Sequence, residues 1–174
     1  MSSTSEAGSG RRRFAVGLGA VALALTVTGC GGPVEIDVPE MDEADAAACA
    51  AFTDDLPETL AEQARVESEP TDAPGAAYGD PAIVVTCGVA APDGFSKASA
   101  CELVNDVGWY IPDEQYGDDE LDLTITAAGY RPRVEIQVPA ELRPNAGAAA
   151  MAKLAPLVAE HAELVEPCGD GLGA

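Results

Sequence analysis

Two segments in the second half of the chain alternate between apolar and polar residues. One covers residues 121–126 and the other covers residues 133–138. Strict alternation places one face of a strand in the core and the other in solvent. The two segments lie close together in sequence on either side of Gly129, so we expect them to pair as an antiparallel hairpin.

Other strands are indicated by runs of apolar residues. A continuous, largely β-branched run over residues 82–89 predicts a buried central strand. Residues 107–111 are mostly apolar and end at Pro112, which indicates a shorter strand. Between the helical segments and the central strand, residues 67–80 are rich in proline and glycine and are expected to form a loop.

Helical patterns occupy the two ends of the same region. Residues 42–52 are alanine-rich behind an acidic cap, and a second helix is expected to start at Asp54-Asp55-Leu56-Pro57 and to run to Val66. Residues 145–165 carry apolar residues at helical spacing, and Pro156 is expected to kink that helix or restart it. The sequence therefore predicts an α+β fold, in which a small antiparallel sheet packs with N- and C-terminal helices.

The N-terminal segment has the order of a bacterial lipoprotein signal. The cluster Arg11-Arg12-Arg13 precedes an uncharged, mostly apolar run over residues 14–27, which is short for a transmembrane helix. The run ends in Val27-Thr28-Gly29-Cys30, which resembles a lipobox. We predict that residues 1–29 are removed as a signal peptide and that Cys30 is the lipid attachment site. An ordinary secretory signal is the alternative, and the general secretory and twin-arginine routes both remain open.

Composition adds a domain plan and excludes one class of partner. We expect a signal peptide at 1–29, a tether at 30–40, a single α+β domain at 41–168 and a flexible tail at 169–174.

The formal net charge is −21 at pH 7, with 30 acidic residues against 9 lysines and arginines. Such a surface repels nucleic acid, so no nucleic-acid partner is expected, and solubility is the favoured interpretation of the charge.

Four cysteines follow Cys30, which is an even number in an exported chain. We therefore predict two disulfides that brace the domain, although the connectivity of four cysteines cannot be deduced from sequence. The pairing that we favour is Cys87–Cys101, closing a local loop, and Cys49–Cys168, tying the start of the domain to its end. A zinc site is not favoured, because the chain has no CxxC pair.

Several short motifs occur in order across residues 45–165. They are Cys49 with Leu56-Pro57, Gly79-Asp80-Pro81-Ala82-Ile83-Val84, Cys87-Gly88-Val89, Val107-Gly108-Trp109 and Val138-Pro139. In order and spacing they resemble a family of actinobacterial envelope lipoproteins known as domain of unknown function 3515. The resemblance implies an actinobacterial cell-surface protein, and it implies no activity because the family has none assigned.

Two positions depart from the pattern of that family. Tyr78 stands where the family usually has tryptophan, and Thr86 stands where a basic residue usually precedes the cysteine. The second departure argues against any role that would need a positive charge at that position.

Candidate catalytic groups are few. The serines beyond the predicted signal are Ser68, Ser96 and Ser99, and none lies in a Gly-x-Ser-x-Gly elbow. The single histidine, His161, falls on the apolar stripe of the last predicted helix, so we interpret it as a half-buried structural residue. Glycoside hydrolysis needs two carboxylates across a cleft, and in a chain this acidic solvated carboxylates are the default interpretation.

An acidic segment around Gly117 is a weak calcium candidate. Asp113, Asp118, Asp119 and Glu120 lie close together in sequence, and hard cations bind clustered carboxylates. The spacing does not match an EF-hand loop, so a solvated acidic loop is the favoured interpretation.

The leading hypothesis is a lipid-anchored protein on the extracytoplasmic face of the cell membrane. It would be a non-enzymatic binding or structural module without a cofactor, with the membrane and an unknown envelope protein or polymer as partners. The alternative is an envelope hydrolase that uses paired carboxylates. A deep pocket with convergent acids would favour the hydrolase, and a shallow surface would favour the binding module.

Overall fold

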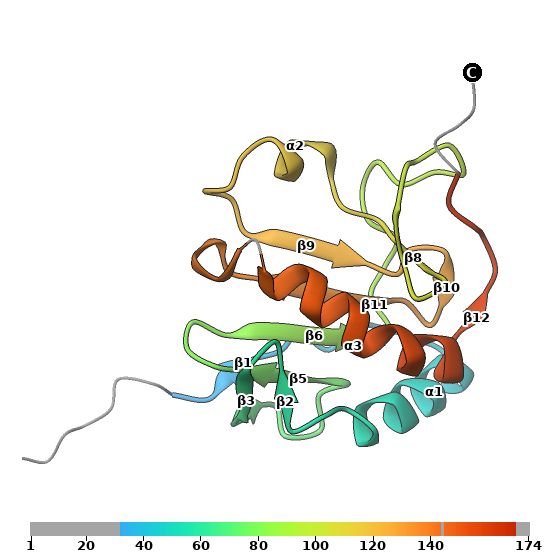
Figure 1. The fold of residues 1–174 in the computed structure, drawn as a ribbon. Helices are drawn as coiled ribbons and strands as arrows, with labels where there is room; N and C mark the ends of the chain where they lie inside the picture. The colour runs from blue at the N-terminus through green and yellow to red at the C-terminus, as the bar shows by residue number, and fades with distance from the viewer. Residues whose placement is uncertain (1–31, 144, 170–174) are drawn as a thin grey trace, which may run out of the picture. The chain divides into compact units, whose positions relative to one another are not determined.

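The computed structural model describes residues 32–143 and 145–169 (Figure 1). The predicted signal peptide and Cys30 lie outside the described residues, so the lipid attachment site stays a prediction. Among the residues that are described, no helix is long and apolar enough to cross a bilayer.

A six-stranded antiparallel sheet forms the centre of the domain and confirms the predicted α+β class. Its strands lie in the order β2 (Thr59–Leu60), β3 (Gln63–Val66), β5 (Gly75–Tyr78), β6 (Ile83–Cys87), β11 (Val134–Val138) and β9 (Leu123–Thr126). The predicted hairpin is the β9–β11 pair, with Ile125 opposite Ile136. The predicted central strand is β6, which pairs with β5 on one side and β11 on the other.

Two helices pack on this sheet. In Figure 1, α3 (Asn145–His161) lies across one face of the sheet, and α1 (Glu43–Asp54) packs beside it. Asp42 caps α1 as predicted, because its carboxylate accepts hydrogen bonds from two backbone N–H groups of the first turn, both at 2.9 Å.

The last helix differs from the prediction at its C-terminal end. It continues through Pro156 as one helix, so the restart that was one of the two expected outcomes does not occur. It ends at His161, and Val165 lies beyond it with 51% of its surface exposed. Residues 163–164 leave the helix because they form β12 (Glu163–Leu164), which pairs with β10 (Tyr130–Arg131).

The predicted second helix, running to Val66, is wrong. The segment forms the β2–β3 hairpin, whose turn residues Ala61 and Glu62 have φ angles of 46° and 66°. Neither residue is a usual turn former, so the local pattern gives no hairpin signal. Burial decides the outcome, because Leu60 is fully buried in the core.

The predicted loop at 67–80 is also partly wrong, because it contains β4 (Ser68–Glu69) and β5. Gly75 explains why β5 was not predicted as a strand. A Cβ at that position would lie 2.0 Å from the carbonyl oxygen of Val85, so this strand needs glycine to approach β6.

Part of the segment at 30–40, which was predicted as a tether, belongs to the folded domain. β1 (Val34–Glu35) pairs in parallel with β4, and Ile36 is only 3% exposed. The chain therefore joins the folded domain from Val34 onward.

The four cysteines form two disulfides, as predicted, but in another pairing than the favoured one. Cys49 is joined to Cys87 and Cys101 is joined to Cys168, with Cα–Cα distances of 5.5 and 5.9 Å. The favoured Cys87–Cys101 pair relied on nearness in sequence, and the favoured Cys49–Cys168 pair relied on joining the two ends of the domain. In the fold, the end of β6 lies under α1, and Ala100 forms a bridge with Gly169, so each cysteine meets a partner from a distant segment.

A further hairpin and two short helices complete the described fold. They are β7 (Glu102–Val104), β8 (Val107–Trp109), the short helix α2 (Asp113–Tyr116) and the 3-10 helix η1 (Ala140–Leu142). β7 and β8 pair around Asn105 and Asp106, whose φ angles are 49° and 66°. Trp109 on β8 is fully buried in the core.

Candidate functional site

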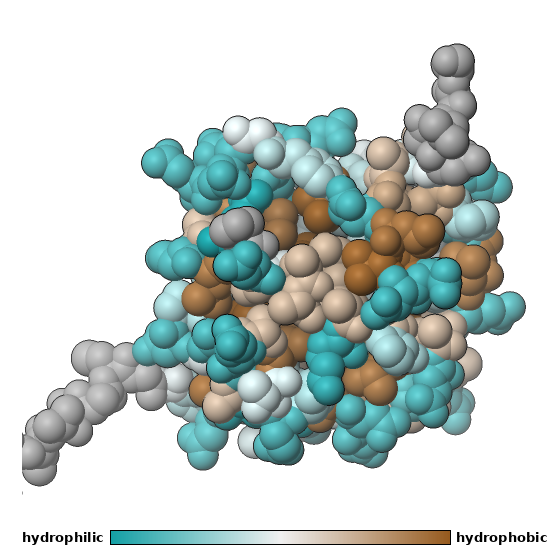
Figure 2. All heavy atoms as spheres, viewed as in Figure 1, coloured by the Kyte–Doolittle hydropathy of each residue, from teal (hydrophilic) through white to brown (hydrophobic). Residues whose placement is uncertain are grey.

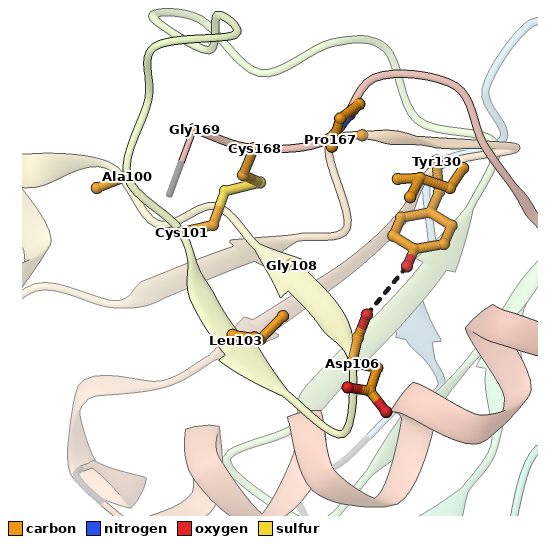
Figure 3. A pocket seen from close by; sticks show the side chains of 11 residues that line it. Ala100, Cys101, Leu103, Asp106, Gly108, Tyr130, Pro167, Cys168 and Gly169 are labelled. Atoms are coloured by element: carbon orange, nitrogen blue, oxygen red, sulfur yellow. Dashed lines mark hydrogen bonds between the residues drawn. A yellow bond between two sulfur atoms is a disulfide. The ribbon is translucent and has the colours of Figure 1, made fainter. Parts of the chain in front are cut away.

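An apolar pocket of about 340 Å³ lies where the β7–β8 hairpin meets the β10–β12 ribbon (Figure 3). It is lined by Ala100, Cys101, Leu103, Asp106, Gly108, Gly129, Tyr130, Leu164, Pro167, Cys168 and Gly169. Pockets that hold small ligands have volumes of about 300–1,000 Å³. The pocket is therefore large enough for one apolar group.

Glycines allow the segments around the pocket to approach one another. A Cβ at Gly129 would lie 2.1 Å from the carbonyl oxygen of Glu166, and one at Gly108 would lie 3.0 Å from the sulfur of Cys168. Any side chain at these positions would push the C-terminal segment away from the β7–β8 hairpin. The pocket therefore depends on glycine as well as on the Cys101–Cys168 disulfide.

Exposed hydrophobic side chains stand at the edge of the pocket. Leu103 is 73% exposed and Leu164 is 51% exposed. Figure 2 shows hydrophobic surface gathered over the corner of the molecule where β8, β10 and β12 lie in Figure 1. On so acidic a chain, two exposed leucines that line the same pocket favour an interaction site there.

The polar groups of the pocket are few. The hydroxyl of Tyr130 donates a hydrogen bond to the backbone carbonyl of Asp106 at 3.5 Å, which ties β10 to the β7–β8 turn (Figure 3). Burial raises the pKa of this phenol, and the nearby Asp106 carboxylate raises it further. Among the described residues that line the pocket, Asp106 is the one carboxylate, and none is a serine, histidine, lysine or arginine.

The acidic segment proposed as a calcium candidate is organised by an arginine. Arg143 donates hydrogen bonds to the backbone carbonyls of Asp118, Leu121 and Gln115, and its guanidinium lies 3.5 Å from the carboxylate of Asp119. In the described part of the chain, these acids do not form a group of three converging ligands. The calcium hypothesis stays a prediction.

His161 lies at the junction of the two helices. Its Nε2 atom is 2.8 Å from a carboxylate oxygen of Asp55, and its side chain is 14% exposed. Its ring meets the ring of Phe52 edge to face at a centroid distance of 6.3 Å. These contacts agree with the interpretation of a half-buried structural histidine, but they also place it beside Asp55, an acid that the sequence did not connect to it.

The candidate serines have local partners. The Ser96 and Ser99 hydroxyls are 3.5 Å apart, and the Ser96 backbone N–H donates to the Ser99 hydroxyl at 2.9 Å. Ser68 lies on β4. No contact in the described residues joins any of them to His161, so the structure gives no nucleophile and base pair there.

The pocket residues were missed at the sequence level, although one signal was present. Asn105-Asp106 lies between the apolar pairs Leu103-Val104 and Val107-Gly108, and Asn and Asp tolerate the positive φ angles of a tight hairpin turn. That signal would have predicted β7 and the exposed position of Leu103. No local sequence signal predicts that Leu164 and Gly129 line the pocket, because long-range contacts bring them there.

Comparison with known proteins adds a family but no activity. No curated protein and no solved structure matches the chain. A family model described as protein of unknown function (DUF3515) matches residues 14–166, which include the central sheet, both helices and most of the pocket. The chain therefore belongs to the DUF3515 family.

Proposed function

We propose that this protein is a lipid-anchored, extracytoplasmic envelope protein that acts as a non-enzymatic binding module. Its binding site is the apolar pocket beside the Cys101–Cys168 disulfide. Its partner is another envelope protein, which presents an extended segment with a hydrophobic side chain that enters the pocket.

The observation that carries the proposal is the exposed apolar lining of the pocket. Leu103 and Leu164 expose 73% and 51% of their surface at its edge. Burying such side chains against a partner contributes about 25 cal/mol for each Å² of apolar surface removed from water. A hydrophobic side chain from a partner would therefore find a favourable environment there.

The strand β7 supplies a second reason to favour an extended partner. In the described part of the chain, β7 pairs with β8 and with no other strand, so it is an edge strand of this hairpin. Extended peptides commonly bind by adding a strand to such an edge, with alternate side chains entering pockets. Leu103 lies in the middle of β7, beside the place where that strand would be added.

The charges around the pocket specify the partner further. Asp106 lines it, and the exposed Glu102 and Glu163 lie on β7 and β12. Lysine or arginine beside the hydrophobic side chain of the partner would meet these carboxylates and increase the rate of association. We therefore expect a basic, apolar segment rather than an acidic one.

The experiment is crosslinking in intact cells followed by mass spectrometry, comparing the unaltered chain with Leu103→Asp. A partner that binds in the pocket should be recovered with the unaltered chain and lost with Leu103→Asp, because a charge at the edge opposes burial of the partner side chain. Leu121→Asp is the matched control, since Leu121 is also exposed, at 41%, and does not line the pocket. Equal recovery with both variants, or no reproducible partner at all, would overturn the proposal.

A further inference from the structure

Three side chains with metal-ligating atoms lie together at the C-terminal ends of α1 and α3. They are Asp55, which follows the last residue of α1, and Glu160 and His161 in the last turn of α3. One ligand atom from each lies within 4.8 Å of the other two. This cluster takes no part in the proposed binding function.

The imidazole in this cluster is held in place by the core. Its ring packs edge to face against Phe52, which is 1% exposed, and α1 and α3 pack against each other. The Asp55 side chain is 53% exposed and Glu160 is also exposed, so both carboxylates are free to adjust their positions. One fixed nitrogen ligand and two adjustable oxygen ligands suit the entry of an ion from solvent.

The distances fit a metal ion after small movements. Zinc ligands lie about 2.0–2.2 Å from the ion, which places neighbouring ligand atoms about 3.3 Å apart in tetrahedral geometry. His161 Nε2 and Asp55 Oδ2 are 2.8 Å apart, so they would separate by a few tenths of an ångström. The remaining separations are at most 4.8 Å, and a rotation of the exposed Glu160 side chain shortens them.

The local charge also favours a cation. Among the ion pairs of the described residues, Asp55 pairs with His161 alone and Glu160 pairs with none. Each helix presents partial negative charge at its C-terminus, and α1 has no basic residue in its last turn. On a chain of net charge −21, neither carboxylate forms an ion pair with a lysine or arginine among the described residues.

We propose that Asp55, Glu160 and His161 bind one divalent transition-metal ion of the zinc type. Nε2 of His161 and one oxygen of each carboxylate are the protein ligands, and water completes the coordination. The imidazole nitrogen favours zinc over calcium and magnesium, which prefer oxygen ligands throughout. A bound ion replaces the direct His161–Asp55 contact and joins the ends of the two helices.

The test is calorimetric titration of the full chain in detergent with Zn²⁺, in buffer stripped of metal, with Ca²⁺ and Mg²⁺ titrated separately. We expect one Zn²⁺ per chain and no comparable binding of Ca²⁺ or Mg²⁺. Glu160→Gln and His161→Gln should each weaken Zn²⁺ binding by more than about tenfold, because each removes one of three ligands. Co²⁺ used as a probe should give visible absorption bands with the unaltered chain, and these should be lost with His161→Gln.

Two matched controls separate this site from other acids. Glu163→Gln changes a neighbouring exposed carboxylate, and Asp119→Asn changes the acidic segment around Gly117. Both should bind Zn²⁺ like the unaltered chain. Because Glu160 is exposed, Glu160→Gln should fold normally, which circular dichroism would verify, and it keeps the test decisive if His161→Gln is unstable. Zn²⁺ binding that is absent, or that survives Glu160→Gln unchanged, would overturn the proposal.

Discussion

At the scale of single residues, the core holds polar atoms without a hydrogen-bond partner. Among the described residues these include the Tyr78 hydroxyl, the Trp109 indole nitrogen and the Thr126 hydroxyl. Tyr78 and Trp109 are fully buried. An unsatisfied buried polar group costs about 1–3 kcal/mol, so these positions mark places where the sequence is not optimised for stability.

Tyr78→Phe is predicted to stabilise the fold, by about 1 kcal/mol, because it removes an unpaired hydroxyl and keeps the ring. The effect should also depend on pH. Burial raises the pKa of Tyr78 from 10.0 to about 12. The folded state therefore holds this proton more tightly than the unfolded chain, and the resulting stabilisation is lost as pH rises from 10 to about 12. Chemical denaturation across that pH range should show a smaller loss for Tyr78→Phe.

Tyr116→Phe is the matched control for this prediction. The pKa of Tyr116 is also raised to about 12, by burial and by Glu102, but its side chain is half exposed. Its hydroxyl donates a hydrogen bond to a Glu102 carboxylate oxygen at 3.2 Å, so removing it gives no stabilisation. A Tyr78→Phe variant less stable than the unaltered chain would show that the Tyr78 hydroxyl is satisfied in the folded state.

At the scale of elements, the two hairpins show what local sequence can reveal. Asn105-Asp106 in the β7–β8 turn are residues that tolerate positive φ, whereas Ala61-Glu62 in the β2–β3 turn are not. The sequence therefore contained a signal for the β7–β8 hairpin, which was not used. It contained no such signal for the β2–β3 hairpin. The strands of the β2–β3 hairpin form because Leu60 is buried and β3 pairs with β5, and both are tertiary effects.

The two disulfides should differ in their resistance to reduction. Cys49 and Cys87 are fully buried between α1 and β6, whereas Cys101 and Cys168 are partly exposed at the pocket. A reductant reaches a disulfide sulfur only where solvent does, so native reduction is predicted to open Cys101–Cys168 first. Thiol labelling over time followed by peptide mapping would measure the order. Simultaneous labelling of all four cysteines under native conditions would contradict the prediction.

At the scale of the whole molecule, charge and predicted anchoring act together. The chain has a net charge of −21, so anionic headgroups repel it and charge alone would not hold it at a membrane. A single acyl chain gives marginal binding, and stable anchoring takes a second one. The predicted diacylglycerol on Cys30 would supply both chains.

Cys30→Ala is therefore predicted to abolish membrane anchoring. The variant should appear in the soluble fraction or remain as an unprocessed precursor, because it lacks the thiol that accepts the lipid. Cell fractionation with immunoblotting would measure this. Thr28→Ala serves as the control, since it keeps a small residue before the cysteine and should stay anchored. A mature Cys30→Ala chain in the membrane fraction would refute the lipid attachment site.

The sequence by itself determined those features that depend on neighbouring residues. Alternation predicted the β9–β11 hairpin, the β-branched run predicted β6, and Asp42 predicted the start of α1. Motif order indicated the DUF3515 family, which the family model confirms. The strands and the helix start are encoded in short stretches of sequence, because side-chain periodicity and capping act over a few residues.

Tertiary structure alone decided the features that join distant segments. The pairing of Cys49 with Cys87 follows from α1 packing on β6, across a sequence separation of 38 residues. The pocket and the Asp55–Glu160–His161 cluster likewise join segments far apart in the chain. No local pattern encodes such long-range contacts, because they result from how the buried faces of all the elements pack together.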